Sequence, residues 1–253
     1  MFTEYGKEYS DDEMILRAWD RECIQDAMGR FMLYWGNGER RRAIDELWVQ
    51  DAENKKSASF GTNIGFFVGL DEVMRHFVTE YEEKQTAVLN AFKSAGHADA
   101  KPGIGMTASH SCTTPILFIA NDGRTARYLC YDLGMSGWGK PDGTADCYHE
   151  IGLCFAEFIR EEGGFKLWHV VEQHDFSIKS GTDYNEVPTV IKDPNDPHKK
   201  NFGNPTVKKD VYNEAWGWEY LFEDMPKPYK TYEEEQGYGA KGKIGKKFYE
   251  RML

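Results

Sequence analysis

The sequence has no long hydrophobic run and no paired cysteine motif. No apolar stretch approaches the ~20 residues that a membrane-spanning helix needs, so we expect no membrane partner. The five cysteines are odd in number and form no C-x-x-C pair, which favours a reduced, cytoplasmic protein over a disulfide-bonded secreted one. The acidic start, MFTEYGKEYSDDE, lacks the apolar centre of a signal peptide.

Positive charge and metal-ligand spacing are also scarce. Lys and Arg number 31 against 42 Asp and Glu, which gives a net charge of −11 and argues against a nucleic-acid partner. None of the seven histidines belongs to an H-x-H, H-x-x-x-H or E-x-x-H pattern, so we expect no metal. The glycine-rich stretch 61–69 lacks the setting of a phosphate loop, and we expect no cofactor.

Helical patterns fill the first third of the chain. Ser10 and Glu13 have the spacing of a capping box, and a helix follows that ends near Gly36. Its apolar residues recur every three or four positions, which predicts a buried face made of Leu16, Trp19, Cys23, Ala27, Phe31 and Trp35. Two further helices are predicted over 39–48 and 70–93, with two short strands in 57–68.

The periodicity then changes to that of strands. Four long strands are predicted over 107–120, 124–137, 147–160 and 165–178, separated by glycine-containing turns. Consecutive hairpins form a curved antiparallel sheet, and the helices must cover one face of it, so the fold class is α+β. We assign residues 1–181 to this domain. Residues 182–253, with no clear period but many aromatics, are predicted to form an extended arm on the domain or on a neighbouring subunit.

Several segments together resemble the SnoaL-like superfamily, which has the cone-shaped fold of nuclear transport factors. Arg30–Glu39 and Ile44–Leu47 are similar to its first two helices, and Ser109–Pro115 is similar to the segment that opens its third strand. Gly164–Val170 resembles the "WKIWH" pattern of its last strand, and Met225–Tyr229 resembles the extension of longer members. The resemblance covers about residues 10–180.

The resemblance implies an α+β cone whose mouth binds a small hydrophobic molecule. Enzymes of the superfamily include polyketide cyclases, dehydratases, steroid isomerases and a diarylpropane lyase, and most use no cofactor. They use His, Asp and Tyr side chains as acids and bases in an apolar pocket. Homo-oligomers are common in the superfamily, and we expect a dimer or trimer here. Fold alone does not determine function, so individual residues must support it.

His110 is the strongest catalytic candidate, because the resemblance places it at the start of a strand that lines the pocket. An imidazole there could exchange protons near neutral pH. If the turn at Asn121-Asp122-Gly123 is a three-residue loop with a left-handed Gly123, His110 lies opposite Gly134 and Asp132 shares its face. A two-residue loop would instead turn Tyr131 toward His110.

Further candidates follow from the later strands and the first helix. His169 lies within the last-strand pattern and is either catalytic or a packed core histidine. Alternation on that strand does not choose a face, because both faces mix apolar and titratable residues. Candidate substrate-binding residues are Tyr34, Trp35, Trp138, His149, Glu172 and His174.

The sequence therefore predicts a cofactor-independent lyase that acts on a small aromatic or polycyclic compound. The expected step is loss of water or of a small carbonyl fragment such as formaldehyde. An isomerase or cyclase that uses the same residues is one alternative. A non-catalytic ligand-binding or assembly subunit is the other.

Overall fold

The computed structural model describes residues 2–4, 7–62, 65–181, 206–208 and 225–243, and all that follows refers to these. Most of the arm predicted over 182–253 lies outside them. The helical elements are α1 (Asp11–Gly36), α2 (Arg40–Leu47), α3 (Ala52–Ser57), α4 (Leu70–Met74), the π-helix η1 (Arg75–Thr79), α5 (Glu80–Ser94) and the short 3₁₀ turn η4 (Glu234–Gln236). The strands are β1 (Phe2–Glu4), β2 (Lys7–Tyr9), β3 (Ser59–Thr62), β4 (Gly65–Val68), β5 (Met106–Ile119), β6 (Thr125–Gly139), β7 (Ala145–Glu161), β8 (Gly164–Lys179) and β9 (Val207–Lys208).

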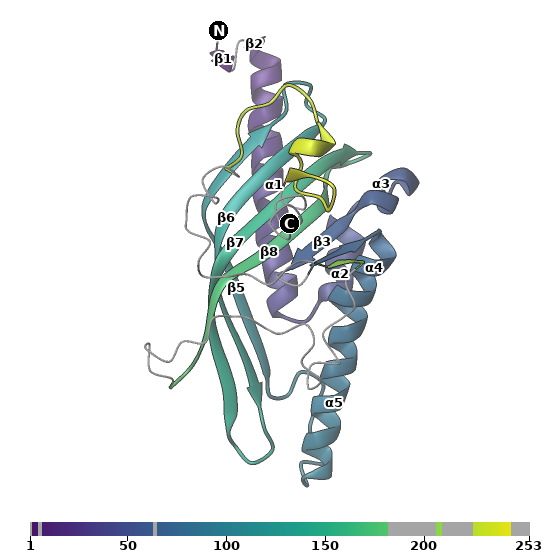
Figure 1. Cartoon of the computed structure of the whole chain (residues 1–253), viewed down its shortest axis with the longest axis vertical. Coiled ribbons are helices and arrows are strands. Elements are labelled where there is room, and N and C mark those ends of the chain that lie inside the picture. Colours follow the sequence, from purple (N-terminus) through teal and green to yellow (C-terminus); the bar gives the residue numbers. More distant parts are fainter. Residues whose placement is uncertain (1, 5–6, 63–64, 182–205, 209–224, 244–253) are drawn as a thin grey trace.

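The main sheet has the order β5-β6-β7-β8-β3-β4-β9. The four long strands pair as consecutive antiparallel hairpins, as the sequence predicts, while β3 joins β8 in parallel. The sheet curves around α1 and stays open between its edge strands (Figure 1). The α+β class is confirmed, with an open curved sheet in place of a barrel.

Helix α1 begins where the capping box predicts. The Ser10 hydroxyl accepts the amide of Glu13, and the Glu13 carboxylate accepts the amide of Ser10. The predicted buried face is wrong by about one position over the first turns. Leu16 and Trp19 are 54% and 66% exposed, and the face against the sheet consists of Asp20, Ile24, Met28, Phe31 and Met32.

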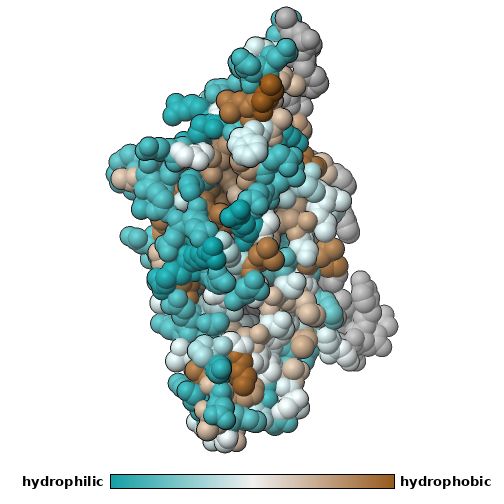
Figure 2. Space-filling view, turned by 180° about the vertical axis from the view of Figure 1, so that it is seen from behind, coloured by the Kyte–Doolittle hydropathy of each residue, from teal (hydrophilic) through white to brown (hydrophobic). Residues whose placement is uncertain are grey.

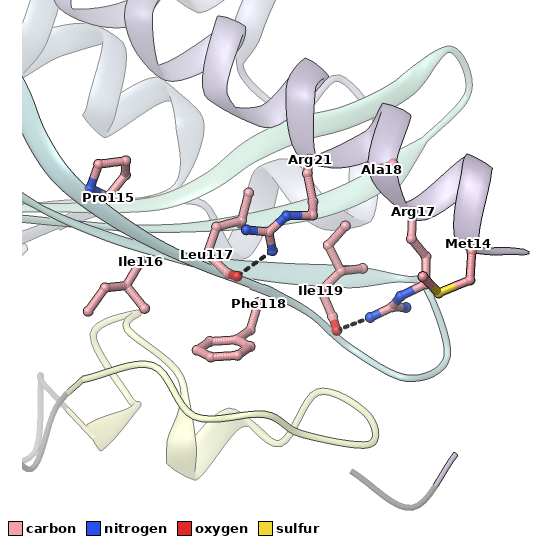
Figure 3. A pocket seen from close by; sticks show the side chains of 9 residues that line it. All are labelled: Met14, Arg17, Ala18, Arg21, Pro115, Ile116, Leu117, Phe118 and Ile119. Carbon is pink, nitrogen blue, oxygen red and sulfur yellow. Dashed lines mark hydrogen bonds between the residues drawn. The ribbon is translucent and has the colours of Figure 1, made fainter. Parts of the chain in front are cut away.

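The surface on the α1 side accordingly carries apolar patches. Figure 2 looks onto this side and shows apolar surface near the end where α1 begins. No helix in the described ranges combines the length and the apolar character needed to cross a bilayer. A groove also runs between α1 and the edge strand β5 (Figure 3). There Arg17 and Arg21 donate to the carbonyls of Ile119 and Leu117 at 2.8 and 2.7 Å, which satisfies edge acceptors.

The β5–β6 hairpin has the predicted pairing around His110, but its turn and its register differ from those predicted. Ala120 pairs with Thr125, so the turn has four residues and not the expected three, although Gly123 is left-handed as predicted, with φ of 70°. The register then shifts between Thr113 and Ile116, where Thr114 has φ of 49° and Pro115 follows. This bulge offsets the longer turn, and His110 lies opposite Gly134.

The outer face of the sheet, away from α1, is covered in part by the C-terminal segment 225–243 (yellow in Figure 1). Tyr238 packs on Phe155 in a second apolar cluster. Its backbone N–H donates to Glu157 at 2.8 Å, and Glu157 also accepts a buried hydrogen bond from Arg127. The long strands are therefore buried on both faces at this end of the sheet.

Candidate active site on the inner face of the sheet

His110 and Asp132 form a buried pair on the inner face of the sheet. His110 Nδ1 lies 2.7 Å from Asp132 Oδ2, and the two side chains are 3% and 0% exposed. The two residues come from neighbouring strands, β5 and β6: His110 pairs with Gly134, and Asp132 lies two residues along β6 from Gly134 on the same face. A carboxylate at this distance fixes the orientation of the imidazole and leaves Nε2 as the second ring nitrogen.

Two glycines make room for this arrangement. A Cβ at Gly134 would lie 3.0 Å from His110 Nδ1, so the imidazole occupies the space above a glycine. A Cβ at Gly152 would lie 2.0 Å from the Gln173 carbonyl oxygen and 2.7 Å from His174 Cα. Gly152 pairs with Asp132 on one side and with His174 on the other, so its lack of a side chain lets the outer two approach.

His174 is the third member of the cluster. Its Nε2 lies 3.8 Å from Asp132 Oδ2, and its ring lies parallel to that of His110 with centroids 6.2 Å apart. At 22% exposure it forms the accessible edge of the cluster. Burial alone would raise the pKa of Asp132, but the hydrogen bond with His110 and the proximity of His174 outweigh it and hold that pKa well below its usual range. Asp132 is therefore a carboxylate, and its buried Oδ1 has no partner in the described ranges.

Trp35 from the last turn of α1 closes the cluster on the helix side. Its indole lies 4.6 Å from the His110 ring and packs edge-on against Phe31, Phe60 and Phe77 at 5.3–5.7 Å. The sequence assigned Trp35 to ligand binding, and the structure brings it onto the imidazole.

Glu172 lies on the same face as His174, two residues earlier on β8. It is 3% exposed, and neither carboxyl oxygen has a hydrogen-bond partner among the described residues. Burial, aided by the negative charge of Asp132, raises its pKa well above the usual value, so Glu172 is a neutral acid. A protonated carboxyl group thus lies close to an ionised one.

The other predicted site residues lie elsewhere. Tyr131 points to the outer face and is 41% exposed, and His149 is exposed and contacts Ser180 at 3.0 Å. Tyr34 donates to Glu46 at 2.8 Å, away from His110. Trp138 is on the inner face, toward α5, with the Lys84 ammonium 3.0 Å from its ring centroid.

His169 lies on the opposite face of the sheet from His110 and Asp132. It is buried on the outer face, where its Nδ1 lies 2.9 Å from the Ser59 hydroxyl and its ring packs under Gly239. Burial lowers its pKa to about 3. The structure therefore presents His169 as a neutral packed histidine, the second of the two readings that its sequence position allowed.

The cluster also has a donor set that suits a metal ion. The nearest ligand atoms of His110, Asp132 and His174 all lie within 4.8 Å of one another. Two imidazoles and a carboxylate suit divalent transition metals. The spacing rules missed this grouping, because its members come from three strands and not from one local motif.

Two polar groups near Trp35 were not among the predicted site residues. Arg40, the first residue of α2, lies among aromatic rings, and His76 in η1 contacts Glu80 at 2.8 Å. π-helical turns are frequent at functional sites, and this one interrupts the helix predicted over 70–93. The run Arg40-Arg41-Arg42 in an acidic chain was the available sequence signal.

The fold and the site together define an α+β protein with a curved open sheet and a His–Asp–His cluster on its concave face, in which the side chains of His110 and Asp132 are buried and His174 is partly exposed. No protein-family model and no curated protein matches the chain.

Solved structures are similar over about two thirds of the chain. The hexachlorocyclohexane dehydrochlorinase LinA-type3 from Novosphingobium barchaimii LL02 has 13% identity and a TM-score of 0.45, over 68% of this chain and 97% of that one. An NTF2-like protein with a cystatin-like fold from Novosphingobium aromaticivorans has 15% identity and a TM-score of 0.43, over 66% and 92%.

Proposed function

We propose that this protein is a lyase that uses His110 and Asp132 for acid–base catalysis on a small aromatic or polycyclic compound. The observation that carries the proposal is the buried contact of 2.7 Å between His110 Nδ1 and Asp132 Oδ2. A histidine whose Nδ1 is held by an ionised carboxylate presents Nε2 as a base, and the carboxylate stabilises the imidazolium that forms.

For loss of water, the proposed steps use the cluster as follows. His110 Nε2 takes a proton from carbon, the electron pair of that C–H bond forms the new double bond, and the C–O bond breaks. His174, when protonated, gives its proton to the departing oxygen, which leaves as water. Its 22% exposure supports this role, because a substrate reaches the cluster most readily at that edge.

The surroundings of the pair support an apolar, planar substrate. The Trp35 indole packs against the imidazole, and Phe60 and Phe77 pack against the indole. In such a low-dielectric setting, the electrostatic interactions between fixed charged groups and the reacting atoms are screened less than in water. In loss of formaldehyde, the same base would take the hydroxyl proton of a hydroxymethyl group, the O–H electron pair would form the new C=O bond, and the C–C bond would break. The electron pair of that C–C bond would take up the proton of His174 at the remaining carbon.

The test is a turnover screen with phenolic, lignan, flavonoid and steroid compounds, read by mass spectrometry. We expect the wild-type protein to convert a member of one class, with the product lighter by water or by formaldehyde. His110→Gln should bind the same compound and lose at least ~100-fold in turnover. Addition of EDTA should leave the wild-type rate unchanged, and a loss of activity that added divalent metal restores would replace the acid–base proposal with a metal-dependent one.

Other outcomes of the screen would support the alternatives. A product of unchanged mass would indicate an isomerase or cyclase at the same residues. Binding without turnover in either protein would favour a ligand-binding protein and would contradict the lyase proposal.

A further inference from the structure

Three consecutive arginines at the start of α2 have very different surroundings. Arg41 pairs with Glu82 at 2.9 Å, and Arg42 pairs with Glu46 at 2.6 Å, both on the surface. Arg40 forms no ion pair within the described part of the chain, although the sequence contains 42 acidic residues. Arg41 and Arg42 thus have carboxylate partners, whereas Arg40 has none among the described residues.

Aromatic rings surround the Arg40 guanidinium. It lies 3.6 Å from the ring centroid of Tyr81, 5.0 Å from that of Phe77 and 5.5 Å from that of Trp35. Its Nη1 donates to the Phe77 carbonyl at 3.2 Å, whereas the buried Nε has no acceptor in the described ranges. Burial lowers the pKa of Arg40 to about 10, so the group stays charged at neutral pH. A half-buried guanidinium whose Nε–H is shielded from water and has no acceptor is costly unless an anion accepts that hydrogen bond.

The position of Arg40 links it to the catalytic cluster. The Trp35 indole contacts both the guanidinium and, at 4.6 Å, the His110 ring. The guanidinium carbon and the imidazole centroid are therefore at most about 10 Å apart. A substituted aromatic molecule is long enough to reach from one group to the other.

We propose that Arg40 recognises a carboxylate on the substrate, so that the protein acts on an anionic aromatic compound. The inference rests on the proposed function, since it names the substrate class for the His110 site. The free Nε edge of a guanidinium binds a planar carboxylate through two parallel hydrogen bonds, and three aromatic faces hold the fork in place. The reacting carbon would then lie beside His110.

The experiment compares matched pairs of ligands that differ only in charge. The probes are benzoate and benzyl alcohol, cinnamate and cinnamyl alcohol, and naphthoate and naphthylmethanol, with affinity measured by calorimetry. We expect the wild-type protein to bind each carboxylate about 10-fold or more tightly than its alcohol. Arg40→Gln should reduce this preference below about 3-fold, while Arg41→Gln, the matched control on the same helix, should keep it.

Several results would overturn the inference. They are equal binding of acids and alcohols by the wild type, no binding of any carboxylate, or a preference that survives in Arg40→Gln. If Arg40→Gln does not fold, Arg40→Lys keeps the charge without the fork and should retain only part of the preference.

His110→Gln separates this inference from the proposed function. This variant should bind the carboxylate probes like the wild type, and it should not convert the compound that the wild type converts in the turnover screen. Turnover that depends on His110 without a carboxylate preference would refute only the inference. Carboxylate binding through Arg40 without turnover in the wild type would refute only the lyase proposal.

Discussion

Glu172→Gln should stabilise the protein, and more so as the pH rises. The folded state raises the pKa of Glu172 well above 4.5 through burial and the nearby charge of Asp132. A raised folded pKa means that the folded state holds the proton more tightly than the unfolded chain. Stability linked to this proton is therefore present below the unfolded pKa and is lost as the pH rises toward the folded pKa.

The size of the effect follows from linkage. Each pH unit in which Glu172 is protonated in the fold and ionised in the unfolded chain costs about 1.4 kcal/mol. Glutamine has nearly the same shape and does not titrate, so the variant avoids this loss. The free energy of unfolding of Glu172→Gln relative to wild type should therefore rise by about 1.4 kcal/mol between pH 5 and pH 6.

The assay is urea unfolding at half-unit pH steps from pH 4.5 to pH 7, with the slopes of the two proteins compared. Glu162→Gln, an exposed carboxylate in the β7–β8 turn, is the matched control for loss of one negative charge. A constant offset from the new buried amide does not affect the slope. A pH-independent difference between Glu172→Gln and wild type would show that Glu172 is ionised in the fold and would refute the reasoning.

Two other substitutions test the packing around the histidines. Gly134→Ala places a Cβ 3.0 Å from His110 Nδ1, which should displace the imidazole and lower turnover about 10-fold. The control is Gly29→Ala in α1, whose Cβ meets nothing within 4 Å and which should raise the free energy of unfolding by ~1 kcal/mol. Equal activity of the two variants would contradict the tight fit of His110 over Gly134. His169→Gln should remove a stability loss of about 1.4 kcal/mol per unit as the pH falls from 6 to 5, because the folded pKa of about 3 keeps His169 neutral while the unfolded chain takes up a proton. Urea unfolding at the two pH values checks this, and parallel curves for the variant and the wild type would refute it.

The sequence predicted the four long strands and their pairing because alternation and turn residues are local signals. The buried face of α1 was harder to predict from the sequence. Leu16 and Trp19 recur with helical spacing, but so do Ile24, Met28 and Met32 on a neighbouring stripe. Only contact with the curved sheet selects between two apolar stripes, and that contact is a tertiary property.

The candidate site was predictable only in part. A three-residue turn was predicted to place His110 and Asp132 on one face, and a two-residue turn to bring Tyr131 there instead. The structure reaches the first arrangement through a four-residue turn and a bulge at Thr114 that offset each other. For β8, alternation put His169 and His174 on opposite faces but could not tell which face is the inner one, because the C-terminal segment buries the outer face as well.

The most direct test of the account is the turnover of Asp132→Asn on a compound that the wild-type protein converts. Asparagine keeps the shape of Asp132, but it removes the charge that stabilises a protonated His110 and can present an N–H in place of the acceptor. The account predicts a folded protein that binds the compound and has lost about 100-fold or more in kcat. An Asp132→Asn variant that turns over the compound at the wild-type rate would contradict acid–base catalysis by this pair.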